Sequence, residues 1–234
     1  MRVTIHQPQY FPYAGFFHKL SLADVFVIMD DVQYDKRFTN RNRIMTPNGW
    51  VWITVPINKE HKFLPNLDVE INNQLAWKEI HWKKIYHSYS GAKYFHAYKD
   101  YFEALYKKDW NFLFELDLET IKQVVKWLGI KIQIITESEL KVKGESTQRL
   151  VNVCKALEAD TYISGSGGKN YLDEKLFEKN RIKLEYQRYK CKSYPQHLSE
   201  LFIPDLSIID MLANVGPDSF KLISNQNMEE PISV

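Results

Sequence analysis

Two short apolar runs near the start of the chain end in side chains that can perform acid–base chemistry. His6 and Gln7 follow the first run, and Asp30 and Asp31 follow the second. Because imidazole titrates near neutral pH, His6 could bind a phosphate when charged or act as a general acid or base. The alternative is a histidine that only hydrogen-bonds the next turn. One aspartate could bind a ribose, a sugar hydroxyl or a metal ion, while the other caps a turn.

The segment between these two runs offers further ligand-binding side chains. Gln7 has donors and acceptors that could orient a ligand, and Tyr10 follows in the same proline-containing loop. Gly15 begins a predicted helix, where free N–H groups favour anions and a glycine permits a close approach. It could equally be a steric requirement of the preceding turn. His18 follows on the same helix and either faces the same site or is solvated beside Lys19.

A basic segment follows the second apolar run. Residues Lys36–Arg43 combine cations with amide side chains, among them Asn40, Arg41 and Arg43. The donor fork of arginine suits phosphate and carboxylate groups. A charged run is usually a solvated face, but the interleaved amides and the position after a strand favour anion binding.

A glycine-rich turn lies between a predicted strand and a predicted helix. It contains Ser164, Gly165, Ser166 and Lys169, and it holds three of the nine glycines of the chain. Such a turn exposes N–H groups toward a phosphate, and Lys169 could add charge. The spacing matches neither a P-loop nor a GxGxxG motif. The alternative is a flexible tight turn.

The composition excludes several classes of protein. The 234 residues are 44% hydrophobic, 14% aromatic and 26% charged, as in an ordered globular protein. A net charge of +2 gives little support for a nucleic-acid-binding protein, so nucleic acid is not an expected partner. Since no run approaches ~20 apolar residues and no signal peptide precedes the first strand, we expect no membrane span and a cytoplasmic location.

The cysteines and histidines do not form a metal-binding motif. Cys154 and Cys191 lie far apart, outside any CxxC or Cys/His spacing. We expect ordinary thiols of a reducing compartment, with a single disulfide as the alternative. No HExxH motif or His-rich cluster indicates zinc, so no metal ligands are assigned. The oligomeric state stays open.

The predicted elements place the polar side chains at one edge of a sheet. Apolar runs predict strands at about Arg2–His6, Val25–Met29, Ile130–Thr136, Thr161–Ser164 and Ile182–Tyr189. Helices are predicted at about Ala14–Ala23, Glu145–Leu157, Tyr171–Asn180 and Ser207–Ala213. Strands that alternate with helices predict an α/β fold with a parallel, Rossmann-like sheet, whose ligands bind at the carboxyl ends of the strands.

Two further elements interrupt this alternation. The pair Asn48-Gly49 predicts a tight turn that joins Arg43–Met45 to Trp50–Val55 in a hairpin and carries Arg41 and Arg43 outward. Residues 73–128 show helical spacing of apolar side chains, and Gly129 is expected as a left-handed cap. We therefore expect a single α/β domain over residues 1–234, with residues 73–128 as a helical insertion or cap.

Several motifs resemble the WbqC-like family of bacterial proteins. They are His6–Lys19, Asp24–Tyr34, Asn40–Ile44, Ser164–Leu172 and Pro204–Leu212. The resemblance covers nearly the whole chain and implies an association with the biosynthesis of O-antigen and other surface polysaccharides. The first strand, its His-containing loop, the helix begun by glycine and the second strand ending in Asp are also similar to nucleotidyltransferase-like α/β enzymes. The HxGH motif of those enzymes is not intact here, and no KMSKS-like sequence is present.

The resulting hypothesis is a transferase that acts on a sugar or nucleotide sugar in surface-polysaccharide biosynthesis, by acyl or aminoacyl transfer. His6, Asp30 and Asp31 would be catalytic, and the ligand would contact Gln7, Tyr10, Gly15, His18, Asn40, Arg41, Arg43, Ser164, Gly165, Ser166 and Lys169. The expected ligand is small and anionic or sugar-containing, and the candidate cofactors are a nucleotide or acyl donor and Mg²⁺. The alternatives are an ATP-dependent nucleotidyltransferase or ligase, and a non-catalytic protein that binds a nucleotide sugar or nucleic acid.

Overall fold

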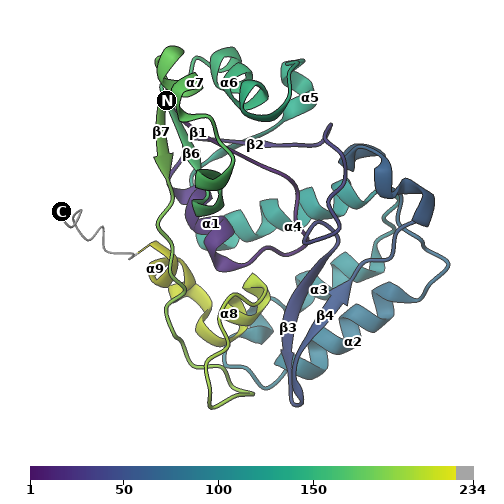
Figure 1. Cartoon of the computed structure of the whole chain (residues 1–234). Coiled ribbons are helices and arrows are strands. Elements are labelled where there is room, and N and C mark those ends of the chain that lie inside the picture. Colours follow the sequence, from purple (N-terminus) through teal and green to yellow (C-terminus); the bar gives the residue numbers. More distant parts are fainter. Residues whose placement is uncertain (225–234) are drawn as a thin grey trace.

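Five of the apolar runs pair into one parallel sheet with the order β5-β2-β1-β6-β7 (Figure 1). The strands are β1 (Arg2–His6), β2 (Val25–Ile28), β5 (Gln133–Thr136), β6 (Thr161–Ser164) and β7 (Lys183–Tyr186). The structure, a computed structural model, describes residues 1–224. Residues 225–234 of the predicted domain lie outside the described residues. The predicted α/β fold with a parallel, Rossmann-like sheet is confirmed.

Helices connect these strands beside the sheet and also make up much of the lower part of the molecule (Figure 1). They are α1 (Ala14–Ser21), α2 (Trp77–Tyr89), α3 (Lys99–Lys107), α4 (Leu113–Leu128), α5 (Glu137–Leu140), α6 (Ser146–Ala156), α7 (Glu174–Lys179), α8 (Ile208–Val215) and α9 (Ser219–Ser224). Short 3-10 turns lie at Lys59–Phe63, Asn66–Asp68, Phe95–Ala97, Ser166–Asn170 and Gly216–Asp218. As predicted, Gly129 ends α4 in a left-handed conformation, with φ of 65°.

The helix predicted at Tyr171–Asn180 is shorter in the structure. The side chain of Asp173 accepts a hydrogen bond from the backbone N–H of Leu176 at 3.3 Å, so α7 begins only at Glu174. This is ordinary N-cap chemistry, because the side-chain oxygen satisfies an N–H that has no partner within the helix. The glycine-rich residues before it form the 3-10 turn Ser166–Asn170 instead.

The two faces of the sheet bury different helices. Val3, Ile5, Val25 and Val27 belong to a hydrophobic cluster with α6 and α7. Phe26 and its neighbour Ile28 point to the other face and pack in a larger cluster with α1 and α4. Successive side chains of a strand point to opposite faces, so the apolar run of β2 is buried on both sides.

The larger cluster also contains the helical region. Buried side chains of α2, α3, α4 and α8 share it with α1 and β2, so these parts have one continuous hydrophobic core. This shared core favours one structural unit. The division into a domain with an inserted cap at residues 73–128 stays a prediction.

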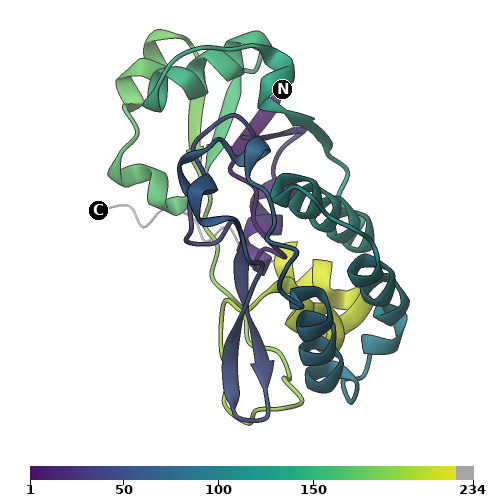
Figure 2. The same cartoon turned by 90° about the vertical axis from the view of Figure 1, so that its right-hand side faces the viewer.

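The predicted hairpin is present and begins earlier than expected. Its strands are β3 (Arg41–Thr46) and β4 (Gly49–Thr54), paired antiparallel. Gly49 has φ of 98°, which a glycine adopts readily in a tight turn. Figure 2 shows this hairpin extending away from the parallel sheet.

The loop between β1 and α1 joins the sheet to the hairpin and to the C-terminal helices. The carbonyl oxygen of Phe11 accepts hydrogen bonds from the Asn42 side chain at 2.8 Å and from the Ser207 hydroxyl at 2.9 Å. The N–H of Ile208 donates to the Pro12 carbonyl oxygen at 2.9 Å. Asn42 lies in β3 and Ser207 precedes α8, so one loop fixes three parts of the molecule.

Among residues 1–224, no helix is both long and apolar enough to cross a lipid bilayer.

One carboxyl group of α4 is buried without a hydrogen-bond partner in the part of the chain that the structure describes. Asp117 is fully buried, and neither of its carboxyl oxygens accepts a hydrogen bond from residues 1–224. Burial raises the pKa of Asp117 well above its usual value, which favours the protonated acid. The folded state therefore holds a proton that the unfolded chain releases above ~pH 4.

We predict that Asp117→Asn changes the pH dependence of stability. In the wild-type protein this group lowers the free energy of unfolding by about 1.4 kcal/mol per pH unit, from ~pH 4 up to the raised pKa of the folded state. The variant lacks this slope and gains stability relative to wild type as the pH rises from 5 to 8. Urea unfolding at several pH values measures the difference. The exposed Asp100→Asn on α3 is the matched control, and parallel pH profiles for wild type and Asp117→Asn would contradict the assignment.

Candidate functional site

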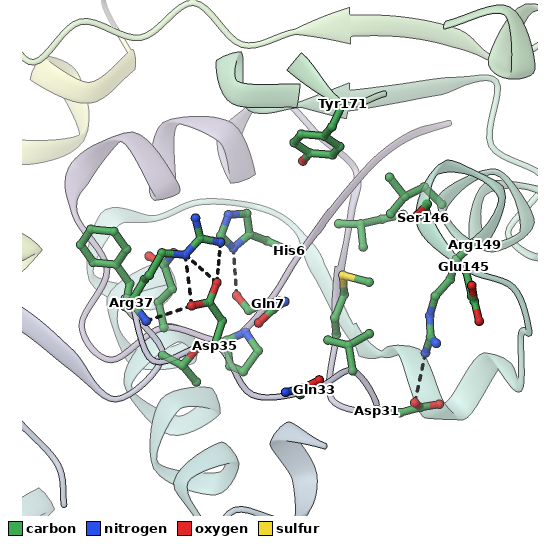
Figure 3. Close-up of a pocket in the computed structure, with 18 of the residues that line it drawn as sticks. His6, Gln7, Asp31, Gln33, Asp35, Arg37, Glu145, Ser146, Arg149 and Tyr171 are labelled. Carbon is green, nitrogen blue, oxygen red and sulfur yellow. Dashed lines mark hydrogen bonds and ion pairs between the residues drawn. The ribbon is translucent and has the colours of Figure 1, made fainter. Parts of the chain in front are cut away.

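A cavity of about 850 Å³ lies at the carboxyl ends of the central strands (Figure 3). It is lined by Ile5, His6, Gln7, Pro8, Gln9, Met29, Asp31, Val32, Gln33, Asp35, Arg37, Phe38, Thr39, Gly144, Glu145, Ser146, Arg149, Leu150, Tyr162 and Tyr171. β1 lies between β2 and β6, and the chain passes from β1 outward to β2 and β5 before it returns to β6. Open α/β sheets bind ligands at this switch point in strand order, and the volume suits a small molecule.

His6 ends β1 and lines the cavity. Its Nδ1 lies 2.9 Å from the carbonyl oxygen of Gln7, and because a carbonyl only accepts, Nδ1 carries the proton. Burial and the nearby Lys19 lower the pKa of His6 to about 3, so the ring is neutral near pH 7. Lys19 is itself buried, and its Nζ donates to the Ile5 carbonyl oxygen at 3.3 Å. The neutral ring leaves Nε2 as an acceptor, which disfavours the alternative role of His6 as a cation that binds phosphate.

The ion pairs of Arg149 and of Arg37 lie toward opposite sides of the cavity (Figure 3). Arg149 of α6 lies 3.1 Å from Asp31 and 2.5 Å from the buried Glu137, which begins α5. Arg37 lies 2.5 Å from Asp35 in the loop after β2. Both guanidinium groups therefore already have carboxylate partners.

The charges of the cavity wall do not favour an anion. Three carboxylates, Asp31, Asp35 and Glu145, face two guanidinium groups, Arg37 and Arg149. Because His6 is neutral, carboxylates are in excess at neutral pH. Such a wall suits a ligand rich in hydroxyl or amine donors.

Asp30 and Tyr10 lie outside the cavity wall. Both carboxylate oxygens of Asp30 accept hydrogen bonds from Ser138, at 3.0 Å from its N–H and 2.5 Å from its hydroxyl. Asp30 is 1% exposed and anchors α5. Tyr10 is fully buried, and its hydroxyl contacts the Tyr106 hydroxyl and His81.

Gly15 and His18 have packing roles. A side chain on Gly15 would lie 2.4 Å from the Tyr13 ring and 2.7 Å from the Tyr189 ring, so the close approach of these tyrosines requires glycine. His18 is 4% exposed, and the Gln187 side chain donates to its Nδ1 at 2.9 Å. The structure thus supports the steric explanation of Gly15 and does not bring His18 to the cavity.

The basic segment divides between the cavity and the hairpin. Arg37 lines the cavity, whereas Asn40, Arg41 and Arg43 lie outside its wall. The Asn40 side chain donates to the Val55 carbonyl oxygen at 2.7 Å and joins the ends of the hairpin. The guanidinium groups of Arg41 and Arg43 lie over tryptophan rings of β4.

The glycine-rich turn hydrogen-bonds largely to itself. Ser164 is buried, and Gly168 packs so closely that a side chain there would lie 2.1 Å from the Ser164 hydroxyl. The N–H of Gly168 donates to the Gly165 carbonyl oxygen at 3.0 Å. Residues Ser164, Gly165, Ser166 and Lys169 lie outside the cavity wall. Lys169 lies over the Tyr186 ring at 5.3 Å, and the turn leads directly to Tyr171, which does line the cavity.

Several residues that line the cavity are not among those that the sequence predicts. They include Gln33, Asp35, Glu145, Ser146, Arg149 and Tyr171. A signal existed for the α6 residues, because a helix that precedes a parallel strand begins at the carboxyl edge of the sheet. Within residues 1–224, His, Cys, Asp and Glu side chains do not gather in threes as they would to hold a metal ion.

We predict that Arg149→Met lowers the free energy of unfolding by about 3–5 kcal/mol, because it leaves the buried Glu137 carboxylate without its cation. Desolvation raises the pKa of Glu137 despite this ion pair, so the pair is held at a cost. The double variant Glu137→Gln/Arg149→Met should therefore lose less than the sum of the single losses. Urea unfolding tests this, with the exposed Lys155→Met on the same helix as control. Additive losses would contradict the coupling.

Comparison with known proteins agrees with the resemblance seen in the motifs. The chain is 31% identical over 220 residues to Rv1507c, an uncharacterised protein of Mycobacterium tuberculosis (strain ATCC 25618 / H37Rv), which covers 93% of this chain and 95% of that protein. No solved structure matches the chain. The family model described as "WbqC-like protein family" matches residues 7–222, which include every residue named above in the cavity wall except Ile5 and His6. The chain belongs to the WbqC-like protein family.

Proposed function

We propose that this protein is a transferase that moves an acyl or aminoacyl group onto a sugar or nucleotide sugar. The observation that carries the proposal is a neutral histidine, with Nε2 as the proton acceptor, at the switch point of a parallel sheet. The association of the WbqC-like family with surface polysaccharides, which the motifs imply, favours a sugar as the acceptor.

The chemistry follows from the polar groups of the cavity wall. An acceptor hydroxyl or amine would give its proton to Nε2 of His6 while its oxygen or nitrogen bonds to the donor carbonyl carbon. The donor's leaving group would depart with the bonding electron pair and take up that proton. Asp31 and Glu145 would accept hydrogen bonds from sugar hydroxyls, and Arg149 would hold Asp31 in place.

A second candidate is an ATP-dependent nucleotidyltransferase or ligase. The strand order and the cavity beside β1 favour it, because sheets of this kind bind nucleotides at their switch point. It requires Mg²⁺-ATP and releases pyrophosphate. A non-catalytic protein that binds nucleotide sugars would bind its ligand without product.

We predict that His6→Asn lowers the turnover of the reactive substrate pair about 10²–10⁴-fold while leaving ligand binding largely intact. Nucleotide sugars and amino sugars are mixed with acyl and aminoacyl donors, with and without Mg²⁺-ATP, and products are detected by mass spectrometry. The exposed His87→Asn serves as the control. Pyrophosphate release would favour the ligase, and full turnover by His6→Asn would exclude His6 as the base.

We also predict an unusual pH profile for this reaction. Because burial lowers the pKa of His6 to about 3, His6 stays unprotonated and able to accept a proton above ~pH 4. The profile of kcat/KM should therefore lack the acidic limb near pH 6.5 that an ordinary histidine base produces. A limb near pH 6.5 that disappears in His6→Asn would contradict the neutral, buried state of the ring.

A further inference from the structure

The hairpin carries a row of stacked arginine and tryptophan side chains. The guanidinium carbon of Arg41 lies 4.5 Å from the centre of the Trp52 ring, and that of Arg43 lies 5.2 Å from the Trp50 ring. The rings of Trp50 and Trp52 are 6.0 Å apart, and Phe38 lies 6.1 Å from Trp52. We call these five residues the Arg–Trp ladder.

The guanidinium groups of the ladder are available to bind an anionic ligand. Within residues 1–224, neither Arg41 nor Arg43 forms an ion pair with a carboxylate. Arg41 donates through Nε to the Arg37 carbonyl oxygen at 3.1 Å, and Arg43 through Nη2 to the Asp205 carbonyl oxygen at 2.9 Å. These bonds and the ring contacts hold the guanidinium groups in place and leave further N–H donors for phosphate oxygens.

The ladder also offers flat aromatic surface. Trp50 and Phe38 are each 43% exposed, which is high for large apolar side chains. Exposed aromatic rings beside arginine provide a stacking surface for a planar ring such as a nucleobase.

The ladder is continuous with the cavity. Phe38 contacts Trp52 and also lines the cavity, as does Arg37, whose carbonyl holds Arg41. The order from the cavity outward is therefore Phe38, then Arg41 with Trp52, then Arg43 with Trp50. A ligand with one part in the cavity can reach the ladder without a break.

The cavity wall and the ladder carry opposite charge. Carboxylates are in excess in the cavity wall, whereas the two guanidinium groups of the ladder have no carboxylate partner among residues 1–224. A ligand that fits both carries hydroxyl or amine donors at one end, and negative charge and a planar ring at the other.

We propose that the Arg–Trp ladder binds the nucleotide half of a nucleoside diphosphate sugar, with the diphosphate on Arg41 and Arg43 and the base on the aromatic rings, while the sugar enters the cavity. This rests on the proposed function and names the substrate class of that site. It differs from a single nucleotide site at the switch point, because the phosphates lie outside the sheet edge.

The test is isothermal titration calorimetry of the full chain with thymidine diphosphate and uridine diphosphate. Arg41→Met and the surface variant Trp50→Ala should each weaken binding about 10- to 100-fold. Arg181→Met removes an exposed arginine elsewhere and should bind like wild type. Thermal unfolding shows whether each variant is folded. If Arg41→Met does not fold, Trp50→Ala still tests the site.

His6→Asn separates the two proposals. If His6→Asn loses turnover but binds the diphosphates like wild type, both proposals are supported. If His6→Asn keeps full turnover while the ladder variants bind the diphosphates more weakly, only the role of His6 is rejected. The ladder assignment is overturned if wild type binds neither diphosphate, or if the ladder variants bind like wild type. It is also overturned if a single-stranded oligonucleotide binds more tightly than the diphosphates through the same residues.

Discussion

The Phe11 carbonyl oxygen, held by Asn42 and Ser207, is the contact on which the arrangement of this protein depends. The sheet alone would leave a strand end open to solvent. The loop after β1 is bound by the hairpin on one side and by the start of α8 on the other, which fixes the course of the chain directly after His6 and Gln7. Phe11 has a positive φ of 41°, a costly conformation for a bulky residue, and these hydrogen bonds hold it there.

The same core that stabilises the fold also desolvates the site. Phe16 of α1 packs edge-on against the His6 ring at 5.3 Å, and Lys19 of the same helix is buried close by. Apolar packing and a neighbouring cation both disfavour the imidazolium. The protonation state of His6 is therefore a property of the α1 interface as much as of the cavity.

Sequence patterns predicted the sheet and part of the site for a clear physical reason. Apolar runs reveal strands, and polar residues that end parallel strands meet at one edge, which located His6, Gln7 and Asp31. The pattern could not separate Asp31 from Asp30, because neighbouring residues of an extended segment point in opposite directions and only the fold decides which one meets Ser138. Arg149 and Tyr171 reach the cavity from segments far away in the sequence, and Arg41 and Arg43 leave it because the hairpin turns away.

The bonds of Asn42 hold the hairpin to the loop that follows β1, and the core that the hairpin shares with Tyr10 and Phe11 of this loop permits little sliding between them. The separation between the His6 ring and the guanidinium groups over Trp50 and Trp52 is therefore built into the scaffold. A molecule that contacts both the His6 ring and these guanidinium groups must have a matching length as well as matching chemical groups. The loop around Phe11 thus fixes the distance that the linker of a two-ended ligand must span. The protein would need no additional side chain to distinguish ligands whose linkers differ in length.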